Sequence, residues 1–132
     1  VPARGDAGEE HLDPVRRMSD GFQIDIDKAV AALPSEPDEQ YVIVFRHGTF
    51  EAGLYAPRDV DEQTPHSRDE AYVVIKGTGV FVCGKTRKVF SPGELLHVPA
   101  GTIHRFEDFS DDLTVWVIFY GPQGGEAKTA AI

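Results

Sequence analysis

The chain of 132 residues contains very little sulfur, with one cysteine (Cys83) and one methionine. A single cysteine excludes a disulfide within the chain and any zinc site built from several thiolates. No apolar run approaches the roughly 18 residues that a membrane-spanning helix needs. No basic stretch followed by an apolar core is visible at the N-terminus, so we expect a soluble, cytoplasmic protein without a secretory signal.

Basic side chains are also scarce, with 13 lysines and arginines against 22 acidic residues and a formal net charge of −9. This balance argues against nucleic acid and against an anionic membrane surface as the main partner. Most of the acidic excess lies in the first 40 residues, so the charge does not exclude a small anionic ligand. An apolar content of 41% is ordinary for one globular domain of this length.

The residue composition changes near residue 40, from a mainly polar segment to short segments rich in β-branched and aromatic residues. We interpret residues 1–40 as a polar N-terminal tail with a short helix and residues 41–122 as a β-domain. Residues 123–132 are rich in glycine and are predicted to form a flexible C-terminal tail.

One short helix is predicted over residues 25–33 of the N-terminal part. Asp25 or Asp27 provides an N-cap, and Pro34 ends the helix. The expected apolar stripe of this helix consists of Ala29, Val30 and Leu33.

From residue 41 onward, short segments rich in β-branched and aromatic residues alternate with turns that contain glycine or proline. Their near-regular spacing, without a helical pattern between them, predicts an all-β sandwich or barrel. The predicted strands span residues 41–46, 50–56, 71–75, 80–82, 86–90, 95–98, 103–106 and 114–120.

Histidines are the most informative polar residues of the β-domain, which contains His47, His66, His97 and His104. A single histidine is more often a surface or hydrogen-bonded residue than a ligand. His66, however, precedes Glu70 by four positions, and His104 follows the tight turn at residues 99–101. One carboxylate and two imidazoles from two hairpins are what an open divalent-metal site needs.

These spacings resemble the two motifs of the cupins, which are small jelly-roll barrels. In the first motif, His66, Glu70 and Gly77 match the family pattern. The first histidine of that motif would fall at Thr64, and its opening glycine would fall at Arg58. The first motif is therefore degraded and lacks one ligand.

The second cupin motif is matched more fully, by Gly93, Pro99, Gly101 and His104, with Asp108 in place of the final asparagine. The chain is similar to small single-domain bacterial cupins. This resemblance implies an all-β jelly-roll barrel preceded by a short helix and a polar tail, and a protein that forms a homodimer.

The resemblance also implies a divalent metal on His66, Glu70 and His104, because many cupins use three histidines and one glutamate. Two histidines and one carboxylate favour Fe(II), and Zn, Mn or Ni can use the same ligands. Among the cupins, hydroxypropylphosphonate epoxidase is similar in its ligand types. Two alternatives stay open: His97 or His47 supplies a fourth ligand, or no metal binds.

Alternation along the strands predicts which side chains line a pocket. If Glu70 and His104 face the interior, Tyr72 and Phe106 do so as well, and Arg105 points outward. Core filling is the alternative role of these aromatic residues. The remaining candidate pocket residues are Thr64, Tyr55, Trp116 and Arg46.

A metal-dependent enzyme acting on a small organic substrate is the expected function, with oxygenase-type chemistry favoured. Arg46 ends an apolar strand and could clamp a substrate carboxylate, the alternative being a solvated strand end. An isomerase or lyase, a module that binds or senses a small molecule, and a scaffold that acts by dimerisation are the alternatives. Cys83 lies beside Gly84 in a predicted turn and is expected to be inert.

Overall fold

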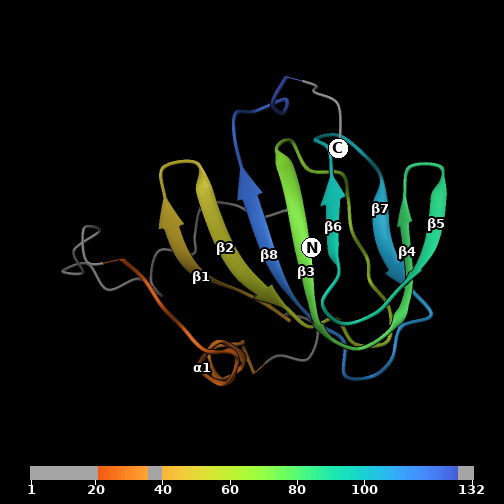
Figure 1. Ribbon diagram of the computed structural model, residues 1–132, viewed down its shortest axis with the longest axis horizontal. Helices are drawn as coiled ribbons and strands as arrows, with labels where there is room; N and C mark the ends of the chain where they lie inside the picture. Colours follow the sequence, from red (N-terminus) through yellow and green to blue (C-terminus); the bar gives the residue numbers. More distant parts are fainter. Residues whose placement is uncertain (1–20, 36–39, 128–132) are drawn as a thin grey trace.

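Two antiparallel sheets make up most of the computed structural model, which describes residues 21–35 and 40–127 (Figure 1). The larger sheet has the strand order β1-β2-β8-β3-β6, and the smaller has the order β5-β4-β7. The strands are β1 Tyr41–His47, β2 Phe50–Tyr55, β3 Asp69–Lys76, β4 Gly79–Cys83, β5 Thr86–Phe90, β6 Leu95–Val98, β7 His104–Glu107 and β8 Thr114–Tyr120.

The predicted all-β barrel with a short helix before it is confirmed. All eight predicted segments are strands, and the largest difference is that β3 begins at Asp69 rather than at residue 71. The extension has a physical cause, because the start of β3 pairs with both of its neighbours, β8 and β6. The tail predicted for residues 1–20 lies outside the described residues, as do residues 128–132.

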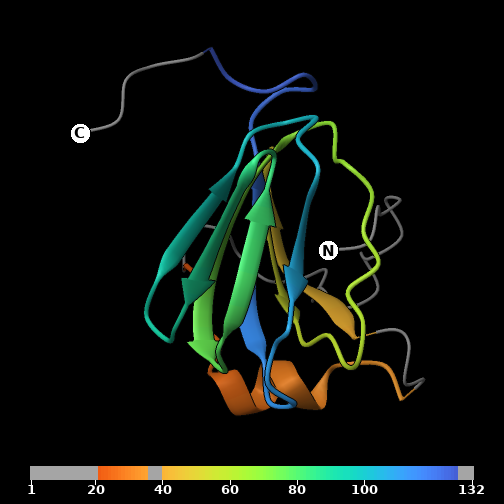
Figure 2. The same cartoon turned by 90° about the vertical axis from the view of Figure 1, so that its right-hand side faces the viewer.

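The main core lies between the two sheets, which face each other in Figure 2. Tyr72 of β3, Phe81 of β4 and Phe106 of β7 meet there, with ring centroids 5.0 to 5.8 Å apart. Burial of an aromatic or large aliphatic side chain contributes about 1.5–3 kcal/mol to folding. Because this core has buried residues from each of the strands β2 to β8, it shows which face of those strands is the inner one.

Helix α1, Ile26–Ala31, begins at the N-cap Asp25, whose side chain accepts a hydrogen bond of 2.8 Å from the backbone N–H of Lys28. Ala29 is fully buried, whereas Val30 is 41% exposed, so the predicted apolar stripe is narrower than expected. A helix of six residues presents little more than one turn to the sheet, and only one side of it can be covered. In the described residues, no helix is long and apolar enough to cross a membrane.

A second apolar cluster covers the outer face of the larger sheet. Ala29 of α1 packs there with Val42 and Leu54, and Trp116 packs against this cluster. Because Val115 and Val117 of β8 are buried in the interior core, the intervening Trp116 projects to the opposite face. The predicted pocket role of Trp116 is thus corrected: its indole packs on the outside of the barrel.

Gly77, the last residue of the first cupin motif, follows β3 with φ +101°, and a Cβ built there would lie 2.6 Å from the Cα of Leu113. Gly93 has a similar φ of +91°, but a Cβ built there would have no heavy atom of a non-adjacent residue within 4 Å. Backbone strain of order 1–3 kcal/mol is expected for alanine at either site. We predict that Gly77→Ala lowers the free energy of unfolding by about 1–3 kcal/mol more than Gly93→Ala does, because of overpacking. Urea unfolding of both variants checks this, and equal losses would contradict it.

Candidate metal centre

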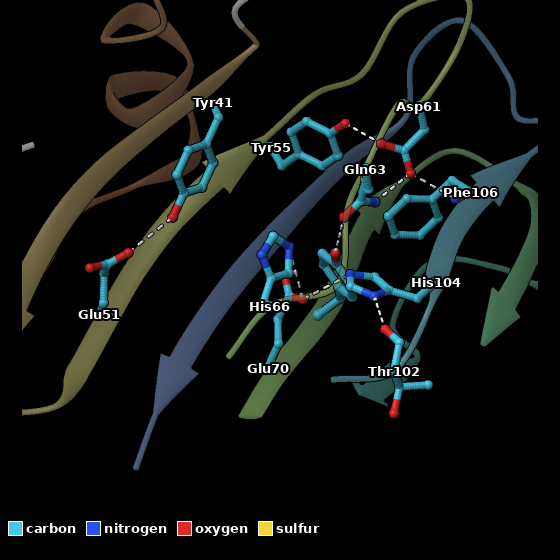
Figure 3. A network of polar contacts seen from close by, with 11 residues as sticks. Tyr41, Glu51, Tyr55, Asp61, Gln63, His66, Glu70, Thr102, His104 and Phe106 are labelled. Carbon is cyan, nitrogen blue, oxygen red and sulfur yellow. Dashed lines mark hydrogen bonds and ion pairs between the residues drawn. The ribbon is translucent and has the colours of Figure 1, made fainter. Parts of the chain in front are cut away.

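The structure brings His66, Glu70 and His104 together inside the barrel (Figure 3). His66 lies on the loop after β2, Glu70 is the second residue of β3, and His104 opens β7 of the opposite sheet. Their ligand atoms all lie within 4.8 Å of one another, and the three residues are 9%, 0% and 2% exposed. Over residues 21–35 and 40–127, this is the only group of three or more His, Cys, Asp or Glu residues with that geometry.

Hydrogen bonds between distant segments hold this centre together. The N–H of Gly101 donates to the carbonyl of His66 over 2.7 Å, and the N–H of Ala100 donates to Asp69 Oδ1 over 2.9 Å. The turn at residues 99–101 is therefore hydrogen-bonded to the loop that carries His66 and to the start of β3. The N–H of Glu126 donates to Asp69 Oδ2 over 2.8 Å, and with Ala100 it lowers the pKa of the Asp69 carboxyl.

The carboxylate of Glu70 faces both imidazoles. Its Oε1 lies 3.0 Å from His104 Nε2 and 3.8 Å from His66 Nε2. The other nitrogen of His104, Nδ1, lies 2.9 Å from the carbonyl oxygen of Thr102. Since a carbonyl only accepts, Nδ1 carries a hydrogen, and a neutral ring then directs a lone pair from Nε2 toward the carboxylate.

A cation fits between these facing atoms. His104 Nε2 and both carboxylate oxygens of Glu70 are buried and have no hydrogen bond within the described part of the chain. Burial of such acceptors is costly unless a proton or a metal ion lies between them. Two imidazoles and a carboxylate are a suitable donor set for a divalent transition metal.

Beside the centre, Asp61 organises a buried network that sequence reasoning missed (Figure 3). It accepts hydrogen bonds from the hydroxyl of Tyr55, the side-chain amide of Gln63 and the N–H of Phe106, the last over 2.7 Å. Burial, with the charge of Asp61 in support, raises the pKa of Tyr55, which keeps this hydroxyl protonated. Asp61 is one of several acidic residues in a polar loop, and its position relative to the predicted ligands matches no motif that would identify it from the sequence.

Tyr72 connects this network to the metal centre. Its hydroxyl donates to Gln63 Oε1 over 3.3 Å. Complete burial, followed by the charge of Glu70, raises the pKa of Tyr72 well above its usual value. The ring centroid lies 6.1 Å from that of His104 and 5.0 Å from that of Phe106, so Tyr72 and Phe106 face inward as predicted.

Aromatic rings shield the two imidazoles. Phe119 meets His66 edge to face, with centroids 5.1 Å apart and an interplanar angle of 83°. Phe81 lies 6.5 Å from the ring of His104 on the side of the smaller sheet. Charges in such apolar surroundings interact more strongly than charges in water.

The two proposed fourth ligands, His47 and His97, and the candidate pocket residue Thr64 lie away from this centre. His47 is exposed at the end of β1, and Thr64 is exposed on the loop before β3. His97 is exposed on β6, with its Nε2 2.7 Å from the hydroxyl of Tyr120. The geometry therefore groups three of the predicted ligands and leaves both proposed fourth ligands outside.

The remaining candidates have different surroundings. Arg46 pairs with Glu51 on the larger sheet, 3.3 Å apart. The side chain of Arg105 is 44% exposed, in agreement with its predicted outward direction. Cys83 packs against the interior core, and burial raises the pKa of its thiol, which disfavours the reactive thiolate.

Comparisons with known proteins agree with this architecture. Residues 53–120 match the family model described as the cupin domain. The uncharacterized protein SCO3923 of Streptomyces coelicolor is 35% identical over 88 residues, which cover 65% of this chain and 84% of that protein.

Two solved structures illustrate the similarity of fold. A cupin 2 conserved barrel domain protein from Salinispora arenicola has a TM-score of 0.59 and 17% identity, covering 76% of this chain and 89% of that chain. The protein NMB1881 from Neisseria meningitidis has a TM-score of 0.60 and 20% identity, covering 76% of this chain and 100% of that chain. At these identities the similarity shows the fold alone.

Replacing Asp61 with asparagine tests the buried network. The asparagine NH₂ group would replace one carboxylate oxygen of Asp61 and would face a group that now donates to that oxygen. At least one buried donor would then lose its acceptor. We predict that Asp61→Asn lowers the free energy of unfolding by about 1–3 kcal/mol. The matched control, Glu62→Gln on the exposed neighbouring residue, should change it by less than about 0.5 kcal/mol. Chemical denaturation measures both, and similar small effects would show that the network is unimportant for stability.

Proposed function

Because the chain belongs to the cupin family, we propose that it is a divalent-metal enzyme that acts on a small organic molecule. The observation that carries this proposal is the arrangement of buried acceptors around one point. Glu70 offers a carboxylate and His104 a ring nitrogen, and the imidazole of His66 closes the group. A structural role alone would not require three buried polar side chains in the interior of a small barrel.

Fe(II) is the metal that we propose for this centre. Two histidines and one carboxylate form the ligand set of non-heme iron oxygenases, which leaves coordination positions open. The bound ion would supply Lewis-acid and one-electron chemistry at those open positions. The proposed reaction class is therefore an oxygenation of a small organic substrate.

The protein's own residues prepare the centre for that chemistry. The carbonyl of Thr102 holds the ring of His104 in one orientation, as supporting groups around metal ligands commonly do. Phe119 and Phe81 keep water from the imidazoles, which limits side reactions of the substrate. The neutral hydroxyl of Tyr72 holds its proton and stays a hydrogen-bond donor beside the carboxylate of Glu70.

Metal content tests the ligand assignment directly. After anaerobic reconstitution with Fe(II), we expect about one iron per wild-type chain by plasma mass spectrometry. Glu70→Ala and His104→Ala should lose most of this metal, because each removes one of three ligands. His97→Ala and His47→Ala are the matched controls and should retain it. If the wild type bound no Fe(II), Mn(II), Ni(II) or Zn(II), the proposal would be wrong. Loss of metal in one of the control variants would instead identify that histidine as a fourth ligand.

Oxygen consumption tests the reaction class separately. We expect the iron-loaded wild type to consume dioxygen with at least one member of a panel of small carboxylates, diketones and phenols. Glu70→Ala, which lacks the ligand carboxylate, should lose this activity by a factor of about 100 or more. An oxygen electrode and product analysis measure the effect. Substrate conversion without oxygen uptake would replace the oxygenase assignment with an isomerase or lyase.

A further inference from the structure

A second polar group lies on the inner face of the larger sheet, in the same cross-strand row as Glu70. The row runs from Arg46 of β1 through Glu51 of β2 and Phe119 of β8 to Glu70 of β3. Residues paired across neighbouring strands project to the same face of a sheet. Because Phe119 belongs to the interior core, Glu51 projects inward as well. Two strand spacings separate Glu51 from Glu70, a distance of roughly 10 Å.

Within the described part of the chain, this second group contains three side chains in contact. Arg46 Nε lies 3.3 Å from Glu51 Oε1, and the hydroxyl of Tyr41 donates to Glu51 Oε2 over 3.5 Å (Figure 3 shows the tyrosine contact). Glu51 is only 7% exposed, and these contacts help to offset the cost of burying its charge. Gly53 makes the arrangement possible, since a Cβ there would lie 2.7 Å from Cε1 of the Tyr41 ring.

A cavity of about 500 Å³ opens beside Arg46 and Glu51. Arg68 lies on its wall and donates hydrogen bonds to the carbonyls of Thr49 and Gly121, which hold its guanidinium in place. Arg68 stands between His66 and Glu70 in the sequence, so the loop that supplies a metal ligand also supplies a wall of this cavity.

We propose that this cavity binds a carboxylate group of the substrate, with Arg46 as the principal donor and Arg68 as a second positive charge. This inference rests on the proposed function, because it assigns the substrate of that metal centre to the organic acids. The guanidinium of arginine is a planar fork that matches a carboxylate in two parallel hydrogen bonds.

The charges of the lining residues favour one carboxylate group in the cavity over a doubly charged group such as a phosphate dianion. Among the lining residues that the structure describes, the two guanidinium groups of Arg46 and Arg68 and the one carboxylate of Glu51 sum to one positive charge. A single carboxylate balances this charge, whereas a phosphate dianion would leave an excess of negative charge. An acid that reaches both places would span the roughly 10 Å between Glu51 and Glu70 and pass Phe119, which lies between them in the row.

Glu51 has two effects in this arrangement. Its carboxylate holds Arg46 at the cavity, and it also competes with the ligand for the same guanidinium. Replacement by glutamine keeps the shape and an acceptor oxygen but removes the competing charge. The two substitutions Arg46→Met and Glu51→Gln should therefore change anion affinity in opposite directions.

Isothermal titration calorimetry with adipate on the metal-free protein tests the proposal. We expect Arg46→Met to weaken adipate binding roughly tenfold or more and Glu51→Gln to tighten it several-fold. Arg87→Met is the matched control, because Arg87 is 53% exposed on the other sheet, and it should bind adipate as the wild type does. Neutral adipamide and inorganic phosphate should both bind more weakly than adipate.

Additional variants guard against loss of the fold, since Arg46→Met removes a guanidinium that pairs with the buried carboxylate of Glu51. Arg46→Lys keeps the charge without the fork and should still weaken binding several-fold. The double variant Arg46→Met, Glu51→Gln removes the ion pair as a whole and should still bind adipate several-fold more weakly than Glu51→Gln does. Adipate affinity that is unchanged in all Arg46 variants, or reduced in Glu51→Gln, would overturn the proposal. Tighter binding of phosphate than of adipate would overturn the assignment to carboxylates.

Two readouts separate this proposal from the metal centre. The Arg46 variants should retain the wild-type metal content, and His104→Ala should retain the wild-type affinity for adipate. If the wild type binds adipate as described but no metal, the carboxylate site stands and the proposed function fails. If metal binds and Arg46 has no effect on adipate, the metal centre stands and the carboxylate site fails.

Discussion

The buried carboxylate of Glu70 is the constraint on which the rest of this structure depends. It lies on the inner wall of the barrel, fully removed from solvent, and faces imidazoles from a loop and from the opposite sheet. An ionised carboxylate in that position costs several kcal/mol unless a cation accompanies it. The fold supplies the nitrogen atoms for such a cation, and Thr102 holds the ring of His104 toward the carboxylate.

The turn of residues 99–101 contributes both to the packing of the barrel and to the geometry of the candidate metal centre. Its backbone N–H groups donate to the carbonyl of His66 and to the carboxylate of Asp69, which precedes Glu70. These two hydrogen bonds join the segments of the two cupin motifs, which are separated along the chain by most of β3 and by β4, β5 and β6. The same contacts therefore also set the distances between the three candidate ligands.

Sequence patterns predicted the directions of side chains well where apolar and polar residues alternate. In β7 the apolar Phe106 and the polar Arg105 alternate, and both directions were predicted correctly. In β8 nearly every residue is apolar, because one face covers the interior and the other covers the cluster under α1. Inward-facing and outward-facing positions of β8 are then both apolar, so the sequence could not predict which way Trp116 points. Val30 was misjudged because the helix is too short to cover a full stripe.

The sequence by itself determined the β-rich fold, the motif spacing and the identity of three buried candidate ligands, because these depend on local propensity and on residues within one strand or turn. Only the tertiary structure decided that Asp61 accepts a hydrogen bond from Phe106, 45 residues away, and that Arg46, Glu51 and Glu70 share one row. Cross-strand register and loop packing arise from contacts over the whole chain, so no local pattern records them.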